Sequence, residues 1–197
     1  MDSIFSPYRI CPIGAHVDHQ GGVVLGRTIN IGATLEYEPL DSRELHLTSE
    51  QFGEVRFAIG ELDHMHWARY AQAAARLLDL KRGMKAHVRG SLIGSGLSSS
   101  ASVGLAYLQA LAAVNDIELT TEQLVQLDHE LEHDQLGLQN GLLDPLGIVY
   151  ARKDALLFID TVTASVTPMV DSPSSDAAWI VAYSGISREL TKSGFNV

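Results

Sequence analysis

The stretch Gly94-Ser95-Gly96-Leu97-Ser98-Ser99-Ser100-Ala101 stands between a predicted strand and a predicted buried helix. Glycines allow backbone conformations in which several amide N–H groups converge, and a helix N-terminus adds a partial positive charge. The serine hydroxyls can donate further hydrogen bonds to phosphate oxygens or bind a metal ion. The segment therefore predicts an anion-binding loop. A flexible linker with a serine N-cap is the alternative, but a linker rarely runs straight into a core helix.

Apolar periodicity on both sides of this loop predicts an α+β fold, because strands and helices interleave without regular βαβ spacing. Thr120 and Gln123 form a capping box that opens one helix, and Gly53 separates two strands as in a hairpin. The predicted strands are 29–35, 45–47, 55–59, 84–88, 155–159 and 179–183, and the predicted helices are 64–80, 100–115 and 120–135.

Breaks in the pattern are expected in two places. Gly137, Gly141 and Pro145 are expected to interrupt regular structure after the third helix. The segment 167–178 is rich in Pro, Ser and Asp and is the predicted linker.

Composition excludes several classes of function. The 197 residues are 46% hydrophobic and 19% charged, so the chain can bury a sizeable core. A net charge of -10 argues against binding to nucleic acid or to an anionic membrane, since both favour a basic face. The single cysteine, Cys11, excludes an internal disulfide and fits a reducing compartment. We expect a cytoplasmic protein without a signal peptide or a membrane span.

The glycine-serine loop lacks the Gly-Lys-Ser/Thr ending of a Walker A motif, and Ser99 occupies the third glycine position of the dinucleotide fingerprint. Its sequence instead resembles the second signature of the GHMP kinases, which include galactokinase, homoserine kinase and mevalonate kinase. The resemblance implies that the loop wraps the triphosphate of ATP and that Ser100 contacts Mg²⁺. The implied nucleotide-binding residues are Gly94, Ser95, Gly96, Leu97, Ser98, Ser99, Ser100 and Ala101.

A second motif, at 9–22, displays an arginine followed by a turn with His16 and Asp18. A histidine and an ionised aspartate can bind vicinal hydroxyls as donor and acceptor, which suits a polyol. A solvated polar turn would not explain the spacing of Arg9, Gly14, His16 and Asp18, which resembles the galactokinase signature. The resemblance implies that Arg9 is catalytic and that His16 and Asp18 bind the sugar.

One position of this motif departs from galactokinases, which have glutamate where this chain has Ala15. In that family the glutamate bonds the C6 hydroxyl of the sugar. Alanine removes a negative charge that would repel a C6 carboxylate. Plant galacturonokinases resemble the chain here, so Ala15 favours galacturonate over galactose. A looser C6 site is the alternative explanation.

A third motif runs from Glu132 to Asp144 and resembles the galactokinase segment between a Mg²⁺-associated glutamate and the active-site aspartate. The resemblance implies that Glu132 and Ser100 hold the metal ion, that Asp144 is catalytic and that Gly141 lies at the sugar. Mg²⁺ normally takes one or two carboxylates and keeps phosphates and waters as its other ligands. Galactokinases usually have glutamine after this aspartate, where the chain has Pro145.

The same stretch contains a competing pattern, His129-Glu130-Leu131-Glu132-His133, which fits the zinc-protease motif H-E-x-x-H. A zinc protease would also need a third ligand downstream, either a histidine or a glutamate. The sequence after His133 contains no histidine, and its only glutamate is Glu189. A zinc hydrolase is therefore a distant alternative to a solvated polar helix face.

The resemblance to the GHMP kinases spans the whole chain and implies two parts: residues 1–175 as the N-terminal domain that binds ATP and sugar, and 176–197 as the start of a C-terminal domain. It implies a two-layer arrangement of a sheet and helices, and it places Phe195 at the sugar, where galactokinases have tyrosine. The family's third, glycine-rich motif does not occur in the sequence, so we expect self-association and little activity from this length of chain. A sugar 1-kinase is the leading function, and a non-catalytic sugar sensor on the same scaffold is the alternative.

Overall fold

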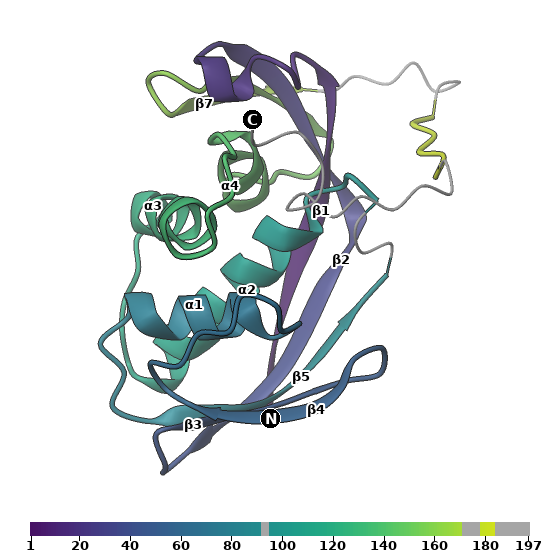
Figure 1. The fold of residues 1–197 in the computed structure, drawn as a ribbon. Coiled ribbons are helices and arrows are strands. Elements are labelled where there is room, and N and C mark those ends of the chain that lie inside the picture. The colour runs from purple at the N-terminus through teal and green to yellow at the C-terminus, as the bar shows by residue number, and fades with distance from the viewer. Residues whose placement is uncertain (92–94, 171–177, 184–197) are drawn as a thin grey trace.

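The structure is a computed structural model, and it describes residues 1–91, 95–170 and 178–183. Within these residues seven strands form one mixed sheet, and four α-helices lie on one side of it (Figure 1). The strands are β1 (Asp2–Ile13), β2 (Val23–Leu40), β3 (Glu44–Ser49), β4 (Gly53–Ala58), β5 (Gly83–Gly90), β6 (Ala155–Asp160) and β7 (Ser165–Val170). The helices are α1 (Arg69–Leu77), α2 (Ser99–Val114), α3 (Thr121–Glu130) and α4 (Leu143–Val149), with a 3-10 turn at Asp18–Gln20 and a π-helix at Leu131–Gln135.

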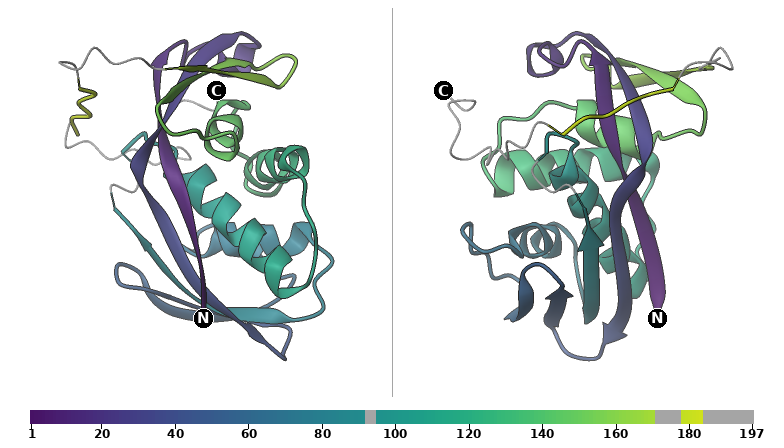
Figure 2. Two further views of the ribbon diagram at one scale, coloured as in Figure 1. Left: turned by 180° about the vertical axis from the view of Figure 1, so that it is seen from behind. Right: turned by 90° about the vertical axis from the view of Figure 1, so that its right-hand side faces the viewer.

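The long strand β2 organises the sheet, whose order is β4-β3-β5-β2-β6-β7, with β1 also paired to β2. Residues 23–26 of β2 pair with β6, and residues 33–40 pair with β5. All pairings are antiparallel except the one between β3 and β5. The sheet curls around the helices, with β6 and β7 at one end and β3 and β4 at the other (Figure 2).

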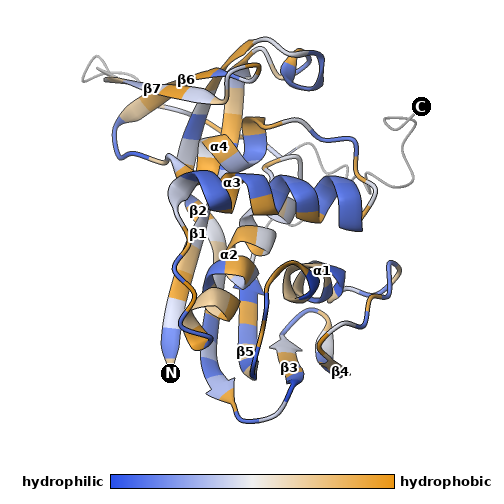
Figure 3. Cartoon of the chain, turned by 90° about the vertical axis from the view of Figure 1, so that its left-hand side faces the viewer, coloured by the Kyte–Doolittle hydropathy of each residue, from blue (hydrophilic) through white to orange (hydrophobic). Residues whose placement is uncertain are grey.

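The main core lies between strands β2 to β5 of the sheet and helices α1 and α2. Helix α2 is apolar on nearly all sides and packs on β1, β2, α1 and α3, so it is buried as its sequence predicts. Apolar positions gather where the helices and the sheet meet (Figure 3). Leucines that are fully buried in this core include Leu35, Leu45, Leu108 and Leu111.

A second, smaller cluster of buried residues holds α4 against β2 and β6. Leu143 and Leu146 of α4 pack with Val24 of β2 and Ile159 of β6. This cluster fixes the start of α4, which carries Asp144, relative to β2, the strand that directly follows the N-terminal motif.

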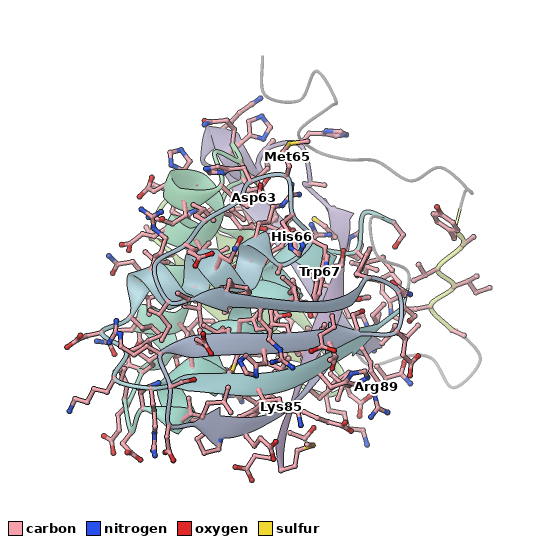
Figure 4. The ribbon with its side chains drawn as sticks, turned by 60° about the horizontal axis from the view of Figure 1, so that its bottom comes forward. Asp63, Met65, His66, Trp67, Lys85 and Arg89 are labelled. Carbon is pink, nitrogen blue, oxygen red and sulfur yellow. The ribbon has the colours of Figure 1, made fainter. Side chains whose placement is uncertain are left out.

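The predicted elements are confirmed for β2 to β5, for β6, for α2 and for the capping box of α3, where Thr120 and Gln123 bond reciprocally. The predicted helix 64–80 is too long, because α1 begins only at Arg69. The backbone N–H of Met65 donates to Asp63 and that of Ala68 donates to His66 (the loop is labelled in Figure 4). These side chains offer the backbone an alternative to helical hydrogen bonds.

Four features differ from the predictions or lie outside them. Strand β1 and helix α4 have no predicted counterpart, and Pro145 does not prevent α4 because it lies in the first turn, where its missing N–H has no helical partner. The predicted linker is wrong at 167–170, which belong to β7. The predicted strand at 179–183 is also wrong: the chain is irregular there, because no strand among the described residues pairs with it.

The α+β expectation is confirmed, with a mixed sheet on one side and helices on the other. The predicted domain boundary at 175 and 176 lies outside the described residues. No helix in the described part of the chain has the length and apolar character needed to cross a membrane.

Candidate active site

Arg9 and Asp144 meet although 135 positions separate them in the sequence. Arg9 lies on β1 and Asp144 in the first turn of α4. Nε of Arg9 donates to Oδ1 of Asp144 at 2.7 Å, and Nη2 donates to the same oxygen at 2.5 Å. Each side chain is 15% exposed. Among the described residues none donates to Oδ2 of Asp144, so that oxygen can accept a bond from a ligand.

Arg9 also contacts the glycine-serine loop. Its backbone N–H donates to the carbonyl of Leu97 at 3.2 Å, and Nη1 lies 3.5 Å from the carbonyl oxygen of Gly96. The arginine therefore lies between the loop that is expected to hold phosphate and the carboxylate of Asp144. A guanidinium at that place suits a phosphoryl group that moves from one side to the other.

The loop turns sharply into α2. Gly96 and Ser98 have left-handed backbone conformations, with φ of 81° and 60°. The Ser98 side chain does not cap the helix, and its hydroxyl is buried without a hydrogen-bond partner. The N–H groups of the first turn of α2 are therefore not used by a serine N-cap, which favours the anion-binding interpretation over a capped linker. Gly94 lies outside the described residues.

Asp18 connects the N-terminal motif to α4. Its Oδ1 accepts the backbone N–H of Leu143 at 2.9 Å. A Cβ at Gly141 would lie 2.5 Å from Cγ of Asp18, so a side chain at that position would displace the carboxylate. Burial raises the pKa of Asp18, and the bond from Leu143 opposes that rise. Ala15 and His16 are exposed in the turn before Asp18.

Thr161, which follows β6, holds this turn in place. Its hydroxyl accepts the N–H of Gly22 at 3.0 Å and donates to the Gly22 carbonyl at 2.9 Å. The hydroxyl also lies 3.3 Å from the carbonyl oxygen of Asp18. Sequence reasoning missed Thr161, since a single threonine after a strand carries no motif.

Glu132 is buried beside Ser100. Its Oε2 accepts a hydrogen bond from Asn140 at 2.9 Å, whereas its Oε1 is buried without a hydrogen-bond partner. Burial, followed by the charge of Asp144, raises the pKa of Glu132 to about 7, and the Asn140 amide and the Ser100 hydroxyl oppose the rise. The role of Asn140 was not predicted, although its place between the two glycines of the third motif could have indicated it.

The residues at Glu132 fit a hard divalent cation. The unpartnered Oε1 and the Ser100 hydroxyl are oxygen donors, which Mg²⁺ prefers. The described residues contain no group of three or more His, Cys, Asp or Glu side chains that could hold a metal ion. A site with one carboxylate and one hydroxyl suits Mg²⁺, which keeps phosphate and water as its remaining ligands.

Asp128 lies one helical turn before Glu132 and was not predicted as part of the site. The residue is fully buried, and neither carboxylate oxygen has a hydrogen-bond partner. Burial raises its pKa well above the usual range, and the charges of Glu132 and Asp144 add to the rise. An aspartate inside an amphipathic helix gives no signal in the sequence by which it could be distinguished from a surface residue.

The zinc-protease interpretation of 129–133 finds no support in the geometry. Oε1 of Glu130, the residue that would act as general base, accepts a hydrogen bond from Gln126 at 2.8 Å. The metal-ligand set of three or more side chains that a hydrolase needs does not occur within the described ranges.

The structure brings together three pairs of predicted site residues: Arg9 with Asp144, Asp18 with Gly141, and Ser100 with Glu132. Ala101 is buried behind the loop in the first turn of α2. Phe195, which was expected at the sugar, lies outside the described residues.

Comparison with known proteins identifies the domain. Residues 68–152 match the family model described as GHMP kinases N terminal domain. The structure also superposes on the crystal structure of Lactococcus lactis galactokinase complexed with galactose, with a TM-score of 0.82 and 28% identity, over 86% of this chain and 47% of that one. The chain carries a GHMP-kinase N-terminal domain.

Curated relatives agree with this GHMP assignment. The chain is 35% identical to the galacturonokinase of Arabidopsis thaliana over 98% of its own length and 53% of the relative's. It is 34% identical to the galactokinase of Thermococcus kodakarensis over 98% of the chain and 56% of the relative. The chain therefore spans about half the length of these relatives.

Proposed function

We propose that the protein transfers the γ-phosphoryl group of MgATP to the anomeric hydroxyl of galacturonate or galactose. The observation that carries the proposal is the Arg9–Asp144 pair, in which two of the three guanidinium nitrogens, Nε and Nη2, donate to one oxygen of the carboxylate. The similarity to galacturonokinase and galactokinase supports this class of reaction.

In this proposal Asp144 binds and orients the anomeric hydroxyl through Oδ2 and accepts its proton. Arg9 holds Asp144 in place and faces the loop through Gly96. The guanidinium can then stabilise negative charge on the phosphoryl group between donor and acceptor. Phosphoryl transfer needs mainly such positioning and electrostatic stabilisation.

The nucleotide would lie over the loop at 95–101, with its phosphates at the N-terminus of α2. Glu132 and Ser100 would hold Mg²⁺, which neutralises phosphate charge when it is bound. The Asn140 amide holds the Glu132 carboxylate at Oε2 and leaves Oε1 for the ion. Glu132→Gln and Ser100→Ala should each raise the Mg²⁺ concentration that nucleotide binding requires, as measured by titration calorimetry.

The sugar would lie at Asp18 and Gly141. Asp18 accepts a backbone bond from Leu143 through Oδ1, and its remaining acceptor capacity can bind sugar hydroxyls, with His16 as a further partner. Ala15 lies in the same turn and adds no negative charge. The absence of a carboxylate at this position favours galacturonate over galactose.

The test is a thermal-shift panel on the full-length protein, with and without MgATP. Ligands that bind the native state raise the apparent melting temperature by mass action. Galacturonate or galactose should raise it, and mevalonate and homoserine should not. A phosphate-transfer assay then separates an enzyme from a non-catalytic sugar sensor. If mevalonate or homoserine stabilises the protein and neither sugar does, the sugar-kinase proposal is wrong.

A further inference from the structure

A cleft of about 720 Å³ lies beside the proposed sugar site. Asp18, Gly141, His129 and His133 are among the residues that line it. The two histidines come from the end of α3 and from the π-helix directly after it. The two histidines have no role in the proposed phosphoryl transfer, so their function at this cleft is a separate question.

The two imidazole rings lie close together. Their centroids are 5.4 Å apart, and the ring planes are inclined by 33°. Residues four apart lie on the same face of a helix, and two histidines at this spacing can bind one metal ion. The ring separation is therefore compatible with one ion bound between the two side chains.

A neighbouring carboxylate orients one of the rings. Nδ1 of His133 lies 2.8 Å from Oδ1 of Asp134. A carboxylate at one ring nitrogen fixes the proton there and leaves the lone pair of the other nitrogen for a metal ion. Metal-binding histidines commonly have such a partner, and it increases the basicity of the ligating nitrogen.

We propose that His129 and His133 bind one transition-metal ion of the zinc class in this cleft. Imidazole ligands suit Zn²⁺ and Ni²⁺, whereas Mg²⁺ prefers oxygen donors. The site is distinct from the proposed Mg²⁺ site at Glu132 and Ser100, because its ligands are nitrogen atoms.

The proposed site is not that of a hydrolase. Glu130 is bonded to Gln126, and the described residues supply no set of three or more protein ligands. The remaining coordination positions of the ion would be filled by water or by an oxygen atom of a ligand in the cleft. With only two protein ligands the ion should exchange readily, unlike the ion of a closed structural zinc site.

The test is isothermal titration calorimetry of the metal-free, full-length protein with Zn²⁺, Ni²⁺ and Mg²⁺. The variants are His129→Gln, His133→Gln and Asp134→Asn, and the control is His46→Gln, a histidine on β3 that lies against Glu44. Wild type and control should bind one Zn²⁺ per chain. Each His→Gln variant should lose Zn²⁺ affinity by more than about tenfold, and Asp134→Asn by about tenfold, which is typical for removal of a residue that orients a ligand.

The outcomes separate clearly. Zn²⁺ binding that depends on both histidines, with Mg²⁺ binding unchanged in the same variants, supports the proposal. If wild type gives no Zn²⁺ binding, or if binding survives in both His→Gln variants, the proposal is overturned. Circular dichroism checks that each variant folds, and Asp134→Asn remains informative if one histidine variant does not.

Discussion

The carboxylate of Asp128 occupies the space where a side chain at Gly104 would lie. A Cβ built on Gly104 would come within 2.6 Å of Oδ1 of Asp128. Gly104 lies inside α2, where glycine costs about 1 kcal/mol relative to alanine. Gly104→Ala should nevertheless destabilise the chain by about 1–3 kcal/mol, because overpacking outweighs the gain in helix propensity. Urea unfolding measures the difference.

A double-mutant cycle identifies the cause. In an Asp128→Ala background the clash is absent, so Gly104→Ala should become neutral or stabilising. Ala113 is exposed on the same helix, and Ala113→Gly therefore serves as the control for helix propensity alone. If Gly104→Ala costs the same amount in both backgrounds, Asp128 is not the residue that it meets.

Burial of Glu132 predicts a fall in stability as the pH rises. The folded-state pKa is raised from 4.5 to about 7. Between these values the unfolded chain has released a proton that the folded chain retains, so the free energy of unfolding decreases with rising pH. The rise from 4.5 to about 7 contributes at most about 3.5 kcal/mol, since a pKa difference of one corresponds to about 1.4 kcal/mol. Asp128, whose pKa is also raised, acts in the same direction.

Urea unfolding in metal-free buffer at several pH values between 4.5 and 7.5 measures how the free energy of unfolding decreases with rising pH. Glu132→Gln should flatten the dependence, since glutamine does not titrate, and the exposed Glu118→Gln should keep the wild-type slope. Equal slopes for wild type and Glu132→Gln would contradict the assignment of the fall to Glu132.

Asp144→Asn in the full-length protein should reduce turnover by about 10²–10⁴-fold, the usual cost of removing a positioned proton acceptor. The asparagine keeps the size of the side chain, and its Oδ1 can still accept the bonds from Arg9, but an NH2 group replaces Oδ2 and cannot accept the sugar proton. Nucleotide binding, measured by calorimetry, should change little because the loop at 95–101 is intact. Near-normal turnover would remove Asp144 from the proposed chemistry.

Ala15→Glu should shift preference from galacturonate towards galactose. A carboxylate at position 15 would repel a C6 carboxylate. For two unit charges ~4 Å apart, the interaction energy is about 1 kcal/mol in water and about 4 kcal/mol near a protein surface. That corresponds to about fivefold to several-hundred-fold in the ratio of specificity constants. The measurement is kcat/KM for both sugars, with Ala15→Gln as the uncharged control. An unchanged ratio would mean that position 15 does not contact C6.

The sequence predicted the parts of the fold that depend on local pattern. The alternation at 29–35 and the apolar helix 100–115 both correspond to observed elements. Helix α4 could not be predicted in this way, because it is short, contains Pro145 and depends on packing against Val24 and Ile159.

The residues of the candidate site also divide into those that a local sequence pattern predicts and those that only the tertiary fold reveals. The residues with family motifs were found, whereas Thr161 acts through a contact with a distant segment and Asp128 is distinguished only by its burial. Such contacts follow from the tertiary fold and not from spacing along the chain. The sequence implied a catalytic role for Arg9 and for Asp144 separately, but it did not predict that the two side chains bond to each other.

The π-helix at Leu131–Gln135 makes this segment sensitive to length. The N–H of Leu136 donates to the carbonyl of Leu131, five residues earlier, so the turn contains one residue more than an α-helical turn. Deletion of a single residue here would allow the turn to become α-helical and would rotate the downstream segment by roughly 100°, the angle for each residue of an α-helix. Asn140 and Gly141 would then lose their alignment with Glu132 and Asp18. Natural variants of this protein should therefore tolerate substitutions in the turn more readily than insertions or deletions, whereas the exposed residues 162–164, which follow Thr161 and precede β7, should accept changes in length.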